Sequence, residues 1–107
     1  MDTTSQTDPV LRRFRAALAE IYGERLERVV LFGSRARGEA RPDSDYDLAV
    51  FLKVLPDRWA ELDRLADLRV RFLDETGAFF DAKPYLTAAF RDATPLMHEI
   101  RRDGLEL

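Results

Sequence analysis

The segment VVLFGSRARGEARPDSDYDLAVFL, residues 29–52, constrains the fold of this chain more than any other stretch. It begins and ends with apolar runs rich in β-branched and aromatic side chains, which are typical of buried strands. We therefore predict strands over Arg25–Phe32 and Asp45–Lys53. Between them lie a Gly-Ser pair, several arginines and several aspartates. So much charge between two buried segments favours a functional site over a simple connection.

Helix signals lie on both sides of this segment. Asp8-Pro9 supplies an N-cap followed by a proline at the first helical position, and Gly23 ends the apolar stripe of that helix. The longest helix is predicted from Pro56-Asp57 through about Glu75, with Gly77 as its stop. Trp59 and Phe72 share its apolar spacing, which favours the core or a partner interface. A short last helix is predicted from Thr94-Pro95 to Asp103.

The remaining elements complete the predicted order. Residues Gly33 to Glu39 are expected to form a turn that opens a short helix, which Arg41-Pro42 would break. Ala78–Leu86 is a third strand candidate, and Pro84 indicates that this strand is at an edge or is ending. Helices and strands alternate, so we expect one α/β or α+β domain of two layers, with a small mixed sheet flanked by helices. The domain would span residues 1–107, with residues 1–7 disordered.

Composition excludes several functional classes. The chain has 107 residues, a formal net charge of -3 and no cysteine. The missing cysteines exclude disulfides, thiolate zinc sites and cysteine nucleophiles. The acidic balance argues against a nucleic-acid partner, since such proteins usually show a basic surface. No apolar run is long enough to span a membrane, and the start of the chain does not resemble a secretory signal, so we expect a cytoplasmic protein.

Asp45 and Asp47 are the first candidate site residues. They are two apart on a predicted strand, so their side chains point to the same face, while Tyr46 and Leu48 point towards the core. Two carboxylates held this close repel each other, and a divalent cation reverses the sign of that interaction. Magnesium is often held by one or two carboxylates, with water and substrate phosphates completing its shell.

Gly33-Ser34 favours a phosphate ligand. The pair follows an apolar strand and opens a helical turn, where backbone N–H groups attract anions and glycine permits close approach. Arg35 and Arg37 lie on the same turn and can reach phosphate oxygens, although both could also be ordinary surface charges. The segment is not a P-loop, because Glu39-Ala40 replaces the Lys-Ser/Thr pair. A phosphate site beside a metal site suits phosphoryl or nucleotidyl transfer.

The pattern LFGS, ten residues from Arg35 to Ser44, then DYD resembles the nucleotidyltransferase superfamily related to DNA polymerase β. The wider stretch GSRARGEARPDSDYDLAV is similar to the minimal nucleotidyltransferases, or MNT proteins, which commonly act as antitoxins of HEPN-domain ribonuclease toxins. This resemblance implies a polymerase β palm-like fold. It also implies that Gly33 and Ser34 hold a nucleoside triphosphate and that Asp45 and Asp47 bind Mg²⁺. The implied reaction transfers AMP from ATP to a hydroxyl, which in the antitoxin subset is a tyrosine of the HEPN toxin.

The resemblance further implies a third catalytic and metal-binding carboxylate on a later strand. Asp81 in AFFDAKPYL is the candidate, although Ala82, Lys83 and Pro84 depart from the apolar residues usual after this position. Lys83 could contact a phosphate or neutralise Asp81. If Asp81 is not catalytic, the chain could be an antitoxin that neutralises its toxin by stoichiometric binding. A drug- or RNA-modifying enzyme is a more remote reading. We expect a complex with a HEPN toxin, a homodimer, or both.

Overall fold

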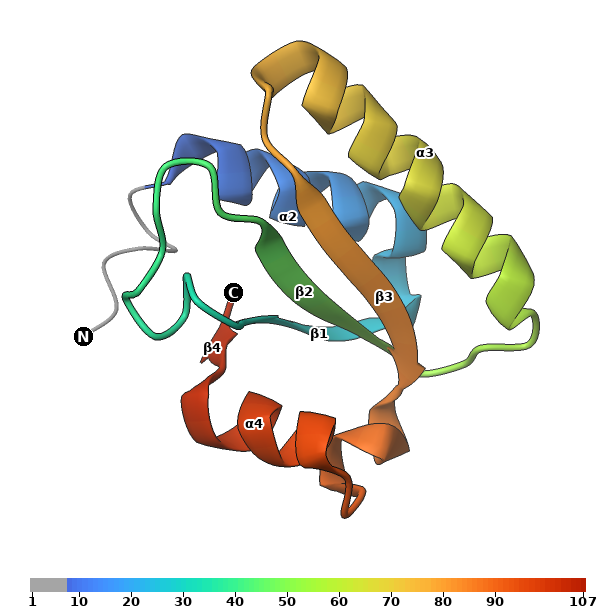
Figure 1. Cartoon of the computed structure of the whole chain (residues 1–107). Coiled ribbons are helices and arrows are strands. Elements are labelled where there is room, and N and C mark those ends of the chain that lie inside the picture. Colours follow the sequence, from blue (N-terminus) through green and yellow to red (C-terminus); the bar gives the residue numbers. More distant parts are fainter. Residues whose placement is uncertain (1–7) are drawn as a thin grey trace.

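Four strands form one mixed sheet in the order β3-β2-β1-β4 (Figure 1). The computed structural model describes residues 8–107, so the disorder expected for residues 1–7 lies outside the described residues. β1 pairs antiparallel with β2 and β4, and β2 pairs parallel with β3. The elements in chain order are α2 (Pro9–Tyr22), η1 (Gly23–Arg25), β1 (Leu26–Phe32), β2 (Tyr46–Leu52), α3 (Arg58–Thr76), β3 (Phe80–Leu86), η2 (Thr87–Arg91), α4 (Pro95–Asp103) and β4 (Leu105–Glu106).

Helices cover both faces of the sheet, so the expectation of two layers is wrong. α2 and α3 lie on one face, and η2 and α4 lie on the other (Figure 1). The reason is that β1 and β2 are apolar on both faces: Val29 packs towards α2 and α3, whereas Val30 packs with Met97 and Ile100 of α4. A strand that is buried on both sides needs a helix on each side. The expected small mixed sheet flanked by helices is confirmed.

The predicted helix ends are confirmed by their caps. Asp8 Oδ1 accepts the N–H groups of Val10 and Leu11 at 3.0 Å, and Pro9 begins α2. Gly77 ends α3 with a left-handed φ of 76° and donates its N–H to the carbonyl of Leu73. Thr94 caps α4 through Met97 N–H. None of the helices within residues 8–107 has both the length and the apolarity needed to cross a membrane.

One local expectation needs correction, and two further features were not expected. Residues 33–39 form a turn but no helix, because Gly38 adopts a φ of +73° and ends the turn after one helical hydrogen bond. Of the two residues expected in the core or at a partner interface, Phe72 lies in the core, whereas Trp59 is 78% exposed. The last residues form β4 against β1, which the short apolar run LEL did not predict. Pro84 lies on an edge strand, as expected, because β3 pairs with β2 alone among residues 8–107.

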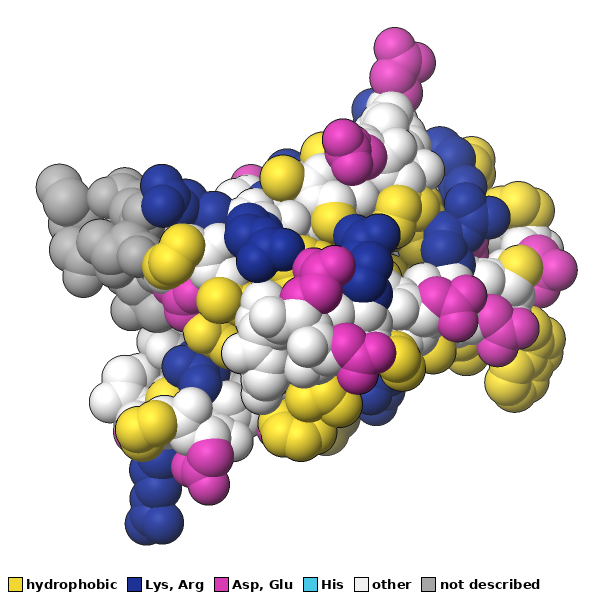
Figure 2. Space-filling model, turned by 90° about the horizontal axis from the view of Figure 1, so that it is seen from above, with side chains coloured by type: hydrophobic (Ala, Val, Ile, Leu, Met, Phe, Trp, Pro, Cys, Tyr) yellow, Lys and Arg dark blue, Asp and Glu magenta, His cyan; other side chains and the backbone are white. Residues whose placement is uncertain are grey.

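The face over α2 and α3 carries interspersed charges. Figure 2 shows basic and acidic side chains lying among apolar ones across this face. An ion pair joins the two helices: Arg13 Nη2 lies 2.9 Å from Glu75 Oε2. Mixed exposed charges of this kind are typical of a solvated surface and contribute little to stability.

Candidate active site

Asp47 and Asp81 lie side by side on neighbouring parallel strands. They are register partners in the β2–β3 ladder, so their side chains leave the same face of the sheet. Asp47 lies on the same face of β2 as Ala49 and Phe51, because alternate residues of a strand share a face. Ala49 and Phe51 pack towards α4. Tyr46 and Leu48 point to the opposite face and are buried against α2 and α3, as predicted. The structure therefore brings the two carboxylates together on the α4 face.

The electrostatics of Asp47 reflect crowding by carboxylates. Burial raises the pKa of Asp47 above its ordinary value of 3.8, and the charges of Asp81, Asp45 and Glu99 raise it further. Asp45 lies immediately before β2 and is exposed. Lys83 opposes these effects only in part: its Nζ lies 4.0 Å from Asp81 Oδ2, and its charge lowers the pKa of Asp47. The site therefore has an excess of negative charge that a cation would relieve.

The turn after β1 runs directly against Asp47. Gly33 has a φ of +75°, and a Cβ at this position would overlap Oδ2 of Asp47. The turn closes when Arg37 N–H donates to the Gly33 carbonyl at 3.2 Å and Glu39 N–H donates to the Ser34 carbonyl at 2.9 Å. The first N–H groups of a helical turn have no partner within it and attract anions. The predicted phosphate loop and the carboxylates thus form one continuous site.

Arg35 is engaged in holding the loop. Its Nε and Nη2 donate to the carbonyl of Ser44 at 3.0 and 2.8 Å, and Nη2 also donates to the carbonyl of Pro42 at 3.3 Å. Its guanidinium stacks on the ring of Tyr46, 3.9 Å from the centroid. Since Tyr46 faces α2 and α3, Arg35 lies away from Asp47. These contacts of Arg35 could not be predicted from the sequence, because they depend on how the loop returns to β2.

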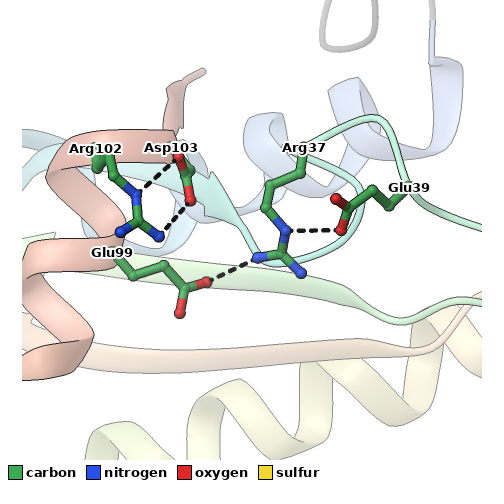
Figure 3. Close-up of polar contacts among 5 residues, drawn as sticks. All are labelled: Arg37, Glu39, Glu99, Arg102 and Asp103. Atoms are coloured by element: carbon green, nitrogen blue, oxygen red, sulfur yellow. Dashed lines mark hydrogen bonds and ion pairs between the residues drawn. The ribbon is translucent and has the colours of Figure 1, made fainter.

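Arg37 lies on the α4 side of the loop (Figure 3). Its Nε donates to Glu39 Oε1 at 2.9 Å and its Nη1 to Glu99 Oε2 at 3.3 Å. These carboxylates, Glu39 first, raise the pKa of Arg37. Glu99 was missed by the sequence reasoning, because only the packing of α4 on the sheet brings it to this loop.

The carboxylates are a type of ligand that fits magnesium. Within residues 8–107, no group of three or more His, Cys, Asp or Glu side chains has a geometry that could hold a metal by itself. Magnesium usually takes only one or two carboxylates and completes its shell with phosphates and water. Asp47 and Asp81 supply the hard oxygen ligands that it prefers, and the negative charge around Asp47 favours a cation.

Comparison with known proteins identifies relatives of this arrangement. The chain is 36% identical over 47 residues to the candidate protein adenylyltransferase MJ0141 of Methanocaldococcus jannaschii; the match covers 44% of this chain and 48% of that protein. The chain thus spans about half the length of this relative.

Solved structures share the fold. One is a chain of a toxin–antitoxin complex with AMP-PNP, with a TM-score of 0.58 and 20% identity over 88% of this chain and 69% of that chain. Another is a chain of the complex of the tri-AMPylated Shewanella oneidensis HEPN toxin with MNT antitoxin, with a TM-score of 0.53 and 16% identity over 91% of this chain and 70% of that one.

The family match includes the whole of the site described above except Glu99. The nucleotidyltransferase domain family matches residues 11–92, a span that contains the Gly33-Ser34 turn and both carboxylate strands. This confirms the resemblance inferred from LFGS and DYD. The chain belongs to the nucleotidyltransferase domain family.

Proposed function

We propose that this chain transfers AMP from Mg-ATP to a tyrosine hydroxyl of a HEPN-domain toxin and thereby neutralises it. The observation that carries the proposal is the contact between the Gly33 turn and Asp47, with Asp81 beside Asp47 in the sheet. A loop suited to phosphate thus adjoins a pair of carboxylates suited to magnesium. Nucleotidyl transfer needs these two features next to each other, because its catalysis is mostly positioning and charge stabilisation.

Each site residue has a proposed role. Gly33 and Ser34 hold the triphosphate through backbone N–H groups and the Ser34 hydroxyl, and Arg37 contacts phosphate oxygens. Arg35 contributes by fixing the loop through Pro42 and Ser44. Asp47 and Asp81 would hold magnesium together with substrate phosphates and water, with Asp45 close by at the start of β2. The ion would offset the negative charge on the reacting phosphates.

The proposed transfer is a single displacement at the α-phosphorus. The acceptor hydroxyl oxygen forms a bond to the α-phosphorus, the bond from the α-phosphorus to the bridging oxygen breaks, and pyrophosphate leaves. Asp81 accepts the hydroxyl proton, because it lies on the edge strand, where an acceptor can approach. A reaction that consumes ATP fits the cytoplasmic location expected from the sequence, which remains a prediction.

The relatives support this proposal at the level of the reaction. One solved neighbour contains AMP-PNP and another contains a toxin that carries AMP. The curated relative is named as a candidate protein adenylyltransferase. Those ligands and modifications belong to the related proteins. The proposal extends the reaction to this chain because its Gly33 turn adjoins Asp47, with Asp81 beside it in the sheet.

Label transfer tests the reaction type. The protein, a HEPN-domain partner and Mg²⁺ would be incubated with ATP labelled at either the α- or the γ-phosphate. We expect label on the partner from the α position only, and none with Asp47→Asn. Transfer of the γ label would instead indicate a kinase and would contradict the proposal.

A second candidate function is neutralisation by binding alone. It is favoured by one observation: Lys83 lies within ion-pair distance of Asp81, which would weaken this carboxylate as a metal ligand. Asp81→Asn separates the two functions. If transfer operates, this variant loses labelling and protection of the cell together; if masking operates, it still binds and inhibits the toxin.

A further inference from the structure

Arg37 is held between two carboxylates from different parts of the chain (Figure 3). Glu39 belongs to the same loop, whereas Glu99 is presented by α4 from the far end of the sequence. The Arg37 and Glu99 side chains are 36% and 31% exposed, so water reaches the pair without fully solvating it. This ion pair links the phosphate loop to α4.

The position of Glu99 is fixed by its neighbours on α4. Met97 and Ile100 are buried against Val30, Ala49 and Phe51, which anchors the helix on the face that carries Asp47. The charge of Glu99 also contributes to the raised pKa of Asp47, which places Glu99 within electrostatic range of the carboxylate site. Glu99 lies beyond residue 92, where the family match ends.

A carboxylate in this position conflicts with a polyanionic ligand. The site already carries the charges of Asp45, Asp47 and Asp81, and a nucleoside triphosphate adds more negative charge. Arg37 lies in the loop beside Glu39, and its planar guanidinium can pair with a carboxylate or with a phosphate. A triphosphate in the loop would therefore compete with Glu99 for Arg37.

We propose that Glu99 is a positioning residue that holds Arg37 at the loop before nucleotide binds and is exchanged for the triphosphate when it does. The inference rests on the proposed function, because it requires that the loop binds a nucleoside triphosphate. Glu99 does not touch the reacting atoms. Its effect is to lower the affinity for nucleotide, because the triphosphate has to displace Glu99 from Arg37.

Nucleotide affinity tests the exchange directly. The dissociation constant of AMP-PNP with Mg²⁺ would be measured by calorimetry for the wild type and for Glu99→Gln. We expect the variant to bind about twofold to fivefold more tightly, the range expected from an ion pair of this exposure. The matched control is Glu75→Gln, which removes the same charge from an exposed ion pair between α2 and α3 and is expected to leave the affinity unchanged.

Two further measurements separate positioning from a structural role. In an Arg37→Gln background most of the gain from Glu99→Gln should disappear, because the arginine that it releases is absent. In the transfer reaction, Glu99→Gln should lower the KM for ATP while kcat stays the same. A merely structural contribution of Glu99 would change thermal stability and would not lower the KM at constant kcat.

The outcomes distinguish the two proposals. If the wild type binds AMP-PNP and Glu99→Gln binds it equally or more weakly, the exchange is wrong and the proposed function stands. A loss of kcat at constant KM would also overturn the exchange, because it would assign Glu99 a role at the reacting atoms. If the wild type binds no nucleotide, both the exchange and the proposed function fail.

Discussion

At the scale of single residues, the site depends on how closely Gly33 approaches Asp47. Gly33 combines a positive φ with a space that a Cβ would fill, since the Cβ would overlap Oδ2 of Asp47. Gly38, in the same loop, has a similar φ of +73° but no atom within 4 Å of the corresponding Cβ position. The two glycines therefore separate the cost of backbone strain from that of steric overlap.

We predict that Gly33→Ala is more damaging than Gly38→Ala. Both substitutions lose the left-handed conformation that glycine permits, which costs about 1 kcal/mol of unfolding free energy. Only Gly33→Ala also displaces the Asp47 carboxylate. This variant should therefore lose most of its transfer activity, and it should lose more stability than Gly38→Ala. Urea unfolding and label transfer on both variants check this. Equal loss of activity in the two variants would contradict a specific contact between Gly33 and Asp47.

The charge on Asp47 should destabilise the fold above acidic pH. Its pKa is raised in the folded protein, so the folded state binds more protons than the unfolded state between pH 3.8 and the raised value, and stability falls as pH rises through that window. Asp47→Asn removes this contribution. We therefore predict that the Tm of the variant exceeds that of the wild type near neutral pH, and that the difference vanishes below pH 3.8. Thermal unfolding across pH measures it; a variant less stable than the wild type at pH 7 would oppose the prediction.

The positions of most candidate site residues were predictable from the sequence, but the contacts of Arg35 were not. Gly33, Ser34, Asp45 and Asp47 follow from spacing along two neighbouring apolar runs, because such local patterns fix side-chain direction. The nucleotide, metal and catalytic roles of these residues and of Asp81 remain predictions. The sequence could not indicate that Arg35 stacks on Tyr46 instead of facing the carboxylates, since this depends on the return path of the loop.

At the scale of elements, α3 is anchored by a buried acidic side chain. Glu61 is 4% exposed, and it forms ion pairs with Arg25 at 2.8 Å and Arg64 at 3.2 Å. Nearby, burial and the charge of Glu61 raise the pKa of Tyr22 to about 12. The start of α3 is therefore tied to η1 by charge, while Leu65, Leu68 and Phe72 bury the rest of the helix.

We predict that Glu61→Gln destabilises the protein and that Glu75→Gln does not. Removal of the buried carboxylate takes away the negatively charged partner of Arg25 and should cost about 1–3 kcal/mol of unfolding free energy. The exposed Arg13–Glu75 pair should contribute less than about 1 kcal/mol. Urea unfolding of both variants gives the comparison. Equal losses would mean that the Glu61 pairs are screened like surface charges.

The order of the elements was predictable, and their pairing was not. Caps and proline positions mark the helix starts locally, which is why Asp8, Gly77 and Thr94 were placed correctly. Nothing local sets the register that puts Asp47 beside Asp81, because it depends on the length of α3 and its crossover. Trp59 fits the apolar spacing of α3 but lies on its exposed side, since the buried stripe there begins at Glu61.

At the scale of the whole molecule, α4 and β4 bring residues 95–106 to the sheet that carries the candidate site. β4 pairs with β1, and α4 covers the face that carries Asp47, so residues far apart in sequence share one surface. The opposite face is closed by α2 and α3 (Figure 1). The candidate site thus lies on the α4 face, and Asp81 lies on the edge strand β3.

The most direct test of this account is the intact mass of a HEPN-domain partner after incubation with this protein, ATP and Mg²⁺. The account predicts mass gains in units of AMP, accompanied by loss of the partner's ribonuclease activity, and neither change with the Asp45→Asn/Asp47→Asn double variant. An unchanged mass, with the partner still inhibited only while the two proteins are bound, would contradict transfer and would assign neutralisation to binding alone.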